Sequence, residues 1–140
     1  MKNIYQYILE ELGLEVNGFC ILKPEFLDYS DDFCTMLTNN GWKIVQKQVR
    51  TLTPEEAKEL YISKKGEDFY NDLCNYMSSG DCLCCMCYKN CEDPIGDMNK
   101  LKDKVRKTWG KDDMKNAMHS SDSLDNVNRE YKLIFENKKI

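Results

Sequence analysis

Apolar residues along this 140-residue chain follow two patterns, one typical of helices and one typical of buried strands. Apolar positions three or four residues apart indicate an amphipathic helix, and short apolar runs between turn residues indicate strands. Residues 1–12 carry a helical stripe that ends at Gly13, and its members are Ile4, Tyr5, Ile8, Leu9 and Leu12. Buried strands are predicted at residues 19–22, 42–49, 82–91 and 116–119.

The segments between these strands carry the signals of helices. The clearest start is residues 53–56, because Thr53 can cap a helix, Pro54 suits its first turn and Glu56 can complete a capping box. Ser30 and Ser123 are the expected N-caps of two other helices, and a charged segment at 93–106 is expected to be helical. The apolar stripes are Phe33, Met36 and Leu37; Ala57, Leu60 and Tyr61; Phe69, Leu73, Tyr76 and Met77; and Leu124, Val127, Tyr131, Ile134 and Phe135.

The order of these elements predicts an α+β fold. When the amino-terminal helix is set aside, the order fits a ferredoxin-like βαββαβ antiparallel sheet with added helices. A chain of this length suits one compact domain. We therefore expect residues 1–17 to form a helical extension and residues 18–140 to form the domain itself.

Composition narrows the function classes. The chain is 41% hydrophobic and 31% charged, with a formal net charge of −4, which is typical of a globular protein. A nucleic-acid backbone requires a basic face, so we expect no specific nucleic-acid partner, whereas a small phosphorylated ligand needs only a few local cations. No apolar run approaches the ~20 residues of a membrane span, and the amino end lacks a signal-peptide core. We expect a cytoplasmic location and no membrane partner.

Cysteine is abundant, and five of the eight cysteines lie within residues 82–91. One interpretation is a metal-thiolate cluster, although no second C-x-x-C pair or histidine stands at the usual zinc spacing. The favoured interpretation is a buried strand in which cysteine serves as a small apolar residue. A cysteine-based metal module remains the weaker alternative.

His119 is the only histidine in the chain. Imidazole is a competent nucleophile when one ring nitrogen is free and an acceptor holds the other. His119 lies between an apolar strand and a run of hydroxyl and acidic residues that opens a helix, where unpaired N–H groups suit anions. These residues alone leave two readings open, a nucleophile and a histidine satisfied by local hydrogen bonds.

Several motifs in the correct order resemble those of the nucleoside diphosphate kinase family. Residues 116–123, N-A-M-H-S-S-D-S, resemble its active-site signature N-x-x-H-G-S-D-S, in which the histidine is phosphorylated. Residues 22–25, L-K-P-E, resemble I-K-P-D, and residues 53–61 resemble the helix with the active-site tyrosine. Residues 69–80 resemble F-F…L…M-x-S-G-P, and residues 105–110, V-R-K-T-W-G, resemble T-I-R-x-x-Y/F-G.

The resemblance implies catalytic roles for four residues. His119 would attack the γ-phosphate of a nucleoside triphosphate, and Glu130, at the position of the family's orienting carboxylate, would accept a hydrogen bond from its other ring nitrogen. Lys23 would contact the sugar hydroxyl and the phosphates. Tyr61 would pack beside the histidine.

The resemblance also implies how the nucleotide is bound. Arg106 would bind phosphate oxygens, Asn116 would bond the ribose, and Phe69 would stack on the base with Leu73 beneath it. Taken singly, Phe69, Leu73 and Tyr61 are better explained as core residues, since they also lie on the apolar stripes of their helices. Mg²⁺ is expected to arrive bound to the nucleotide, without a metal cage of protein ligands. The implied partners are nucleoside tri- and diphosphates and a second copy of the chain, as a homo-oligomer with a dimer favoured.

The sequence departs from the family pattern before Arg106. The family has a loop there, G-x-T-x-P…P-G, of which most is missing, and its phosphate-binding threonine has no counterpart. The position of a phosphate-binding arginine aligns near Asn99, with Lys100 or Lys102 as substitutes. In addition, Ser120 replaces the glycine after the histidine, while Asp81 and Glu25 replace the proline of S-G-P and the aspartate of K-P-D.

Two function classes follow from these comparisons of residues. The first is a kinase that transfers the γ-phosphate from a nucleoside triphosphate to a nucleoside diphosphate through a phosphohistidine. The second is a kinase-like domain of weak or no activity that binds nucleotide or a protein partner. The retained site residues favour the first class, and the shortened loop favours the second.

Overall fold

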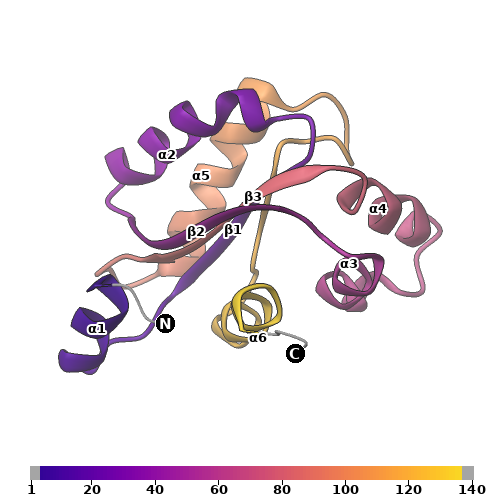
Figure 1. Cartoon of the computed structure of the whole chain (residues 1–140). Helices are drawn as coiled ribbons and strands as arrows, with labels where there is room; N and C mark the ends of the chain where they lie inside the picture. Colours follow the sequence, from indigo (N-terminus) through magenta and orange to yellow (C-terminus); the bar gives the residue numbers. More distant parts are fainter. Residues whose placement is uncertain (1–3, 137–140) are drawn as a thin grey trace.

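The computed structural model describes residues 4–136 (Figure 1). The elements in chain order are α1 (Ile4–Glu11), β1 (Gly18–Leu22), α2 (Ser30–Asn39), β2 (Lys43–Thr51), α3 (Pro54–Leu60), α4 (Tyr70–Met77), β3 (Asp81–Tyr88), α5 (Pro94–Trp109), β4 (Met118–Ser120) and α6 (Leu124–Phe135). Two short 3₁₀ turns, at Leu27–Tyr29 and Ile62–Lys64, precede α2 and follow α3. This order of helices and strands is the one predicted from the apolar pattern.

The four strands form one antiparallel sheet in the order β2-β3-β1-β4. β1 lies in the centre and pairs with both β3 and β4, so that Ile21 stands opposite Cys84 on one side and His119 on the other. This arrangement is the predicted ferredoxin-like βαββαβ sheet. It brings the end of β1, followed by Lys23, beside the start of β4, which carries His119.

Helices cover both faces of the sheet (Figure 1). α2 and α5 pack on one face, where Cys20 and Leu22 of β1 point, and α3, α4 and α6 pack on the other, where Phe19 and Ile21 point. Successive side chains of a strand face opposite sides, so β1 contributes to both cores and all five of its residues are buried.

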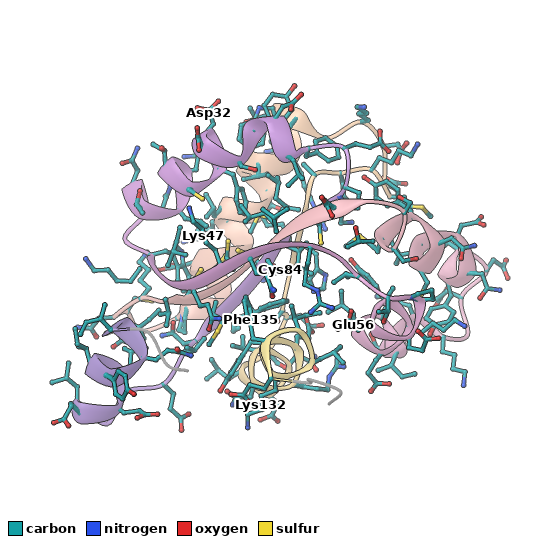
Figure 2. The ribbon with its side chains drawn as sticks, in the orientation of Figure 1. Asp32, Lys47, Glu56, Cys84, Lys132 and Phe135 are labelled. Carbon is teal, nitrogen blue, oxygen red and sulfur yellow. The ribbon has the colours of Figure 1, made fainter. Side chains whose placement is uncertain are left out.

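The cysteine-rich segment 82–91 was predicted to be a buried strand, and β3 confirms this as far as Tyr88, while Cys91 lies beyond the strand and is half-buried. Cys84 lies in the core beneath α6, in the same cluster as Phe135 (Figure 2). Cys82 belongs to that cluster too, while Cys85 and Cys87 belong to the cluster beneath α2 and α5. All eight cysteines are free thiols, and no group of described residues has the arrangement of a metal site. The neighbouring Cys20 thiol raises the pKa of Cys85 through a hydrogen-bond interaction, and burial raises it further, as expected of a thiol in the core.

Three local expectations differ from the structure. Ser30 is the first helical residue of α2 and not its N-cap, because the 3₁₀ turn before it supplies the helix entry and the Ser30 hydroxyl donates to the Leu27 carbonyl at 2.6 Å. α3 ends at Leu60, so Tyr61 is its C-cap. Leu124 is exposed rather than buried. A β-bulge between Ile44 and Gln46 explains the imperfect alternation of β2.

The predicted amino-terminal helix is present as α1, and Gly13 follows it with a left-handed φ of +69°. Leu9 packs against the core, whereas Ile4, Ile8 and Leu12 of the predicted stripe are exposed. The described structure does not include the side chain of Tyr5, which belongs to the predicted stripe. Residues 1–3 of the expected extension (1–17) and residues 137–140 of the expected domain (18–140) also lie outside the described residues. Among the helices of the described chain, none has the length and apolar character required to span a bilayer.

Candidate active site

A cavity of about 530 Å³ opens where the end of β1, the end of α3, the start of α4, the last turn of α5 and the segment before β4 converge. It is lined by Lys23, Tyr61, Lys64, Phe69, Leu73, Arg106, Asp113, Met114, Asn116 and His119. Seven of the eight residues expected from the sequence are in this lining. The eighth, Glu130, lies behind the histidine on α6.

A buried carboxylate holds the imidazole of His119. The Nε2–H group of His119 donates to Oε1 of Glu130 at 2.6 Å, and the Ser121 hydroxyl donates to the same oxygen at 3.0 Å. Arg129 lies 3.5 Å from the other carboxylate oxygen. An acceptor on Nε2 keeps the proton there, and Nδ1 has no hydrogen-bond partner among the described residues. The imidazole therefore has the tautomer of a nucleophile, with a free lone pair on Nδ1.

An aromatic side chain fixes the other side of the histidine ring. Tyr61 meets it edge-on, with ring centroids 5.1 Å apart. The Tyr61 hydroxyl is buried without a hydrogen-bond partner in the described structure. Burial raises the pKa of Tyr61, and the negative charge of Glu130 raises it further. The phenol therefore remains protonated and can donate a hydrogen bond to a ligand in the cavity.

Lys23 is a nearly fully buried lysine, with 3% of its surface exposed. It comes directly after β1, and its Nζ donates to the Met114 carbonyl at 3.1 Å. Burial lowers the pKa of Lys23 to about 7, and the positive charges of Arg106 and Lys102 contribute to the same shift. An anion bound in the cavity would therefore stabilise the charged form of this buried amine.

Arg106 is held by α5 and by the strand that carries the histidine. Its Nε and Nη2 groups donate to the Met118 carbonyl at 3.2 and 3.0 Å. These two bonds fix the plane of the guanidinium, which has five N–H donors. The remaining donors are available to an anion in the cavity, a geometry suited to phosphate oxygens.

The backbone before β4 is strained where it turns Asn116 toward the cavity. Ala117 has a left-handed φ of +79°, which is uncommon for a residue with a Cβ. Asn116 donates from Nδ2 to the Asp113 carbonyl at 2.8 Å, and its Oδ1 is buried without a partner in the described chain. Strain of this kind is concentrated at functional sites, and the unpaired acceptor can receive a ligand hydroxyl.

The open end of the cavity is apolar on one side and charged on the other. Phe69 is 42% exposed at the start of α4, and Leu73 lies buried one turn further on. Exposure favours a stacking role for Phe69, whereas the burial of Leu73 also fits the core. The lining residues Lys64 and Asp113 were not expected from the sequence.

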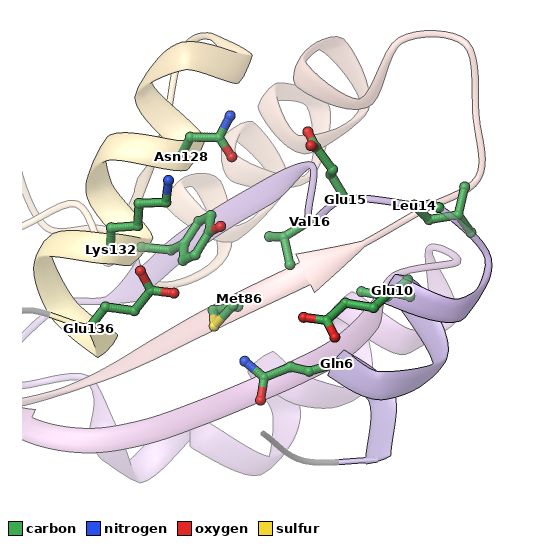
Figure 3. A pocket seen from close by; sticks show the side chains of 12 residues that line it. Gln6, Glu10, Leu14, Glu15, Val16, Met86, Asn128, Lys132 and Glu136 are labelled. Atoms are coloured by element: carbon green, nitrogen blue, oxygen red, sulfur yellow. The ribbon is translucent and has the colours of Figure 1, made fainter. Parts of the chain in front are cut away.

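A second cavity, of about 450 Å³, lies between α1, α6 and β3 (Figure 3). Its lining includes the acidic residues Glu10, Glu15 and Glu136 and one cation, Lys132. Carboxylates in excess repel a phosphorylated ligand. The cavity at His119, lined by three cations, is therefore the candidate site.

The fold and this site define a class. The protein is a ferredoxin-like domain with a histidine, held by a carboxylate, at the base of a cationic cavity. Comparison with known proteins gives the family. The sequence profile described as "Nucleoside diphosphate kinase" matches residues 17–140, and the chain belongs to the nucleoside diphosphate kinase family.

Relatives agree with this assignment. A nucleoside diphosphate kinase of Bdellovibrio bacteriovorus is 32% identical over 134 residues, covering 87% of this chain and 94% of its own. Nucleoside diphosphate kinase homolog 5 of Homo sapiens is 29% identical over 126 residues, covering 82% of this chain but 59% of its own. The chain thus spans about three fifths of that longer relative.

Solved structures share the fold. The nucleoside diphosphate kinase of Aquifex aeolicus superposes with a TM-score of 0.77 at 24% identity, covering 86% of this chain and 94% of its own. The nucleoside diphosphate kinase of Encephalitozoon cuniculi gives a TM-score of 0.79 at 18% identity, covering 88% of this chain and 92% of its own. At these identities, the likeness establishes the architecture of the chain.

Proposed function

We propose that the protein transfers the γ-phosphate of a nucleoside triphosphate to a nucleoside diphosphate through a phosphohistidine at His119. The observation that carries this proposal is the Glu130 bond to Nε2, which leaves the Nδ1 lone pair of a cavity-lining histidine free. Phosphoryl transfer requires mainly positioning and charge stabilisation. Lys23 and Arg106 supply positive charge beside the histidine.

In the first half-reaction, Nδ1 of His119 attacks the γ-phosphorus. The new N–P bond forms as the bond between the γ-phosphorus and the β,γ-bridging oxygen breaks, and the nucleoside diphosphate leaves with the electron pair. The proton on Nε2 stays in its bond to Glu130, which stabilises the cationic ring during attack. In the second half-reaction, a terminal phosphate oxygen of another nucleoside diphosphate attacks the phosphohistidine and restores the free imidazole.

The remaining residues position the nucleotide. Arg106 and Lys23 bind the phosphates, Asn116 accepts from the ribose, and the protonated Tyr61 hydroxyl donates to the phosphate end. Phe69 stacks on the base, a contact that tolerates base identity. Mg²⁺, arriving with the nucleotide, would neutralise phosphate charge.

The test is labelling with γ-³²P-ATP and Mg²⁺. We expect an acid-labile, base-stable phosphoenzyme that the His119→Ala variant does not form, because the chain has a single histidine. The label should then pass to added nucleoside diphosphates. Label on a hydroxyl residue, or nucleotide binding with no label, would contradict the proposal.

A second candidate function is nucleotide binding with little transfer. The observation that favours it is the unbroken helix α5, which stands where the family has a phosphate-binding loop. Binding by calorimetry together with absent label would support this candidate. The expected homodimer, the cytoplasmic location and the division at residue 17 stay predictions, and sedimentation would test the dimer.

A further inference from the structure

Asp113 is the unexplained residue of the cavity at His119. Of the described residues that line this cavity, it alone carries a carboxylate, whereas Lys23, Lys64 and Arg106 carry positive charge. A carboxylate repels the phosphates that these cations would attract. Its place in the lining therefore points to a contact with another part of the ligand.

The loop between α5 and β4 holds the backbone of Asp113 in place. The preceding residue, Asp112, accepts from two N–H groups of the same loop at 2.9 and 2.7 Å, which closes a turn. The Met114 carbonyl accepts from the buried Lys23 at 3.1 Å, and the Asp113 carbonyl accepts from Asn116 at 2.8 Å. A position anchored in this way loses little freedom when a ligand binds.

The Asp113 carboxylate lies free at the mouth of the cavity. In the part of the chain that the structure describes, its side chain has no hydrogen bond or ion pair. Asp113, Lys64 and Phe69 are the exposed lining residues, whereas Tyr61, beside His119, is buried. Since the proposed function takes the phosphates to His119, the base of the nucleotide lies at this mouth.

The face and the edge of a base are recognised by different groups. Stacking on Phe69 uses the face, which every base has. The edges differ, and guanine alone among the common bases has two neighbouring N–H donor groups, N1–H and the N2 amino group. A carboxylate has two acceptor oxygens that receive such a pair of donors. Adenine has a lone pair at N1, and cytosine has one at N3, where guanine has the N1–H group.

We propose that Asp113 selects guanine nucleotides by accepting hydrogen bonds from N1–H and the N2 amino group of the base. This inference rests on the proposed function, and it adds a base preference to a stack that alone tolerates every base. Lys64, from the turn after α3, suits the O6 and N7 acceptors of the same ring. Adenine or cytosine in this place would meet the carboxylate with a lone pair, which disfavours their binding.

The test compares four nucleoside diphosphates that differ in the base. GDP, IDP, ADP and CDP are titrated by calorimetry with Mg²⁺ and without triphosphate, so that no phosphate is transferred. We expect GDP to bind at least about 10-fold more tightly than ADP or CDP, as for hydrogen bonds to a charged group. IDP keeps the N1–H group but lacks the N2 amino group, and its affinity should lie between those of GDP and ADP.

Two variants assign the preference to one carboxylate. Asp113→Asn keeps the shape of the side chain and removes its charge, and should bring the affinities for GDP and ADP within about 3-fold of each other. The change should come from weaker GDP binding, while ADP binds as tightly or more tightly, because a charge that repels phosphate is lost. Asp68→Asn removes the same charge from an exposed residue next to Phe69 that is outside the lining, and should leave the preference unchanged.

The results separate this inference from the proposed function. If the unmodified protein forms the phosphoenzyme but binds GDP no more tightly than ADP or CDP, the role of Asp113 is refuted and the kinase proposal stands. Asp113→Asn also refutes it by keeping the full preference, or by weakening GDP and ADP equally, which is the effect of a structural role. If the unmodified protein binds no nucleoside diphosphate, both proposals fail.

Discussion

Replacement of Lys23 should make the protein more stable and less active. The pKa of Lys23 is lowered from 10.5 to about 7 by burial and by the neighbouring cations. At 1.36 kcal/mol for each tenfold change, keeping this amine charged in the fold costs about 5 kcal/mol. Lys23→Met removes that cost and leaves the Met114 carbonyl without its donor, a loss of about 1–3 kcal/mol. We expect a net gain of about 2–4 kcal/mol in the free energy of unfolding at pH 6.

The gain should depend on pH in a defined direction. Below pH 7, both the folded and the unfolded chain hold the Lys23 proton, so the full cost of burying the charge is present. Between pH 7 and 10.5, only the unfolded chain holds it, and the stability of the unmodified protein rises with pH relative to the variant. The advantage of Lys23→Met should therefore shrink from pH 6 to pH 9.5.

Urea denaturation in the presence of a thiol reductant measures this difference. Titrating cysteines affect both proteins alike, so the comparison at each pH isolates Lys23. In the same preparation, the phosphoenzyme should form much more slowly, because a phosphate-binding cation is missing. A variant that is less stable than the unmodified protein at pH 6, or an advantage that does not narrow at pH 9.5, would refute the reasoning.

Two further substitutions test the carboxylate that orients His119 and the aromatic residue proposed to stack on the nucleotide base. Glu130→Gln replaces the charged acceptor of His119 with a neutral one, and the time course of labelling should slow about 10- to 100-fold, in line with a charged hydrogen bond of 1.5–3 kcal/mol; an unchanged time course would contradict the role of Glu130. Phe69→Ala removes a stacking surface and should weaken nucleotide binding in calorimetry by about 5- to 150-fold, as for 1–3 kcal/mol per base. Equal affinity would place the base elsewhere.

Sequence signals that are complete within a few residues predicted their structures well. The capping box of Thr53 and Glu56 is present with both hydrogen bonds, because its donors and acceptors lie within one turn of each other. Ser123, an expected cap, accepts a hydrogen bond from the Asn126 N–H in the same local manner at the start of α6. The strand Gly18–Leu22 was recognisable because it is buried on both faces and has no polar position.

Features that depend on packing between distant segments were not predictable. Ser30 was mispredicted for a local reason, because the adjacent 3₁₀ turn takes its hydroxyl. Ser121 bonds Glu130 across nine positions in sequence, which no spacing rule indicates. The lining role of Lys64 and the burial of Lys23 arise from how α4 and the segment before β4 close over the end of the sheet.

The unbroken course of α5 has a consequence for how this stretch can change in length. Each residue of a helix is rotated about 100° around the axis from the one before it. One residue added between the Asp93 cap and Arg106 would therefore turn the Arg106 side chain to a different face of the helix. An addition of about seven residues, two full turns, would return the Arg106 side chain to the same face of the helix but move it about 10 Å along the axis. An insertion that lengthens the helix therefore cannot keep both the direction of the Arg106 side chain and its distance from Asp93, and added residues leave the guanidinium in place only if they form a loop outside the helix.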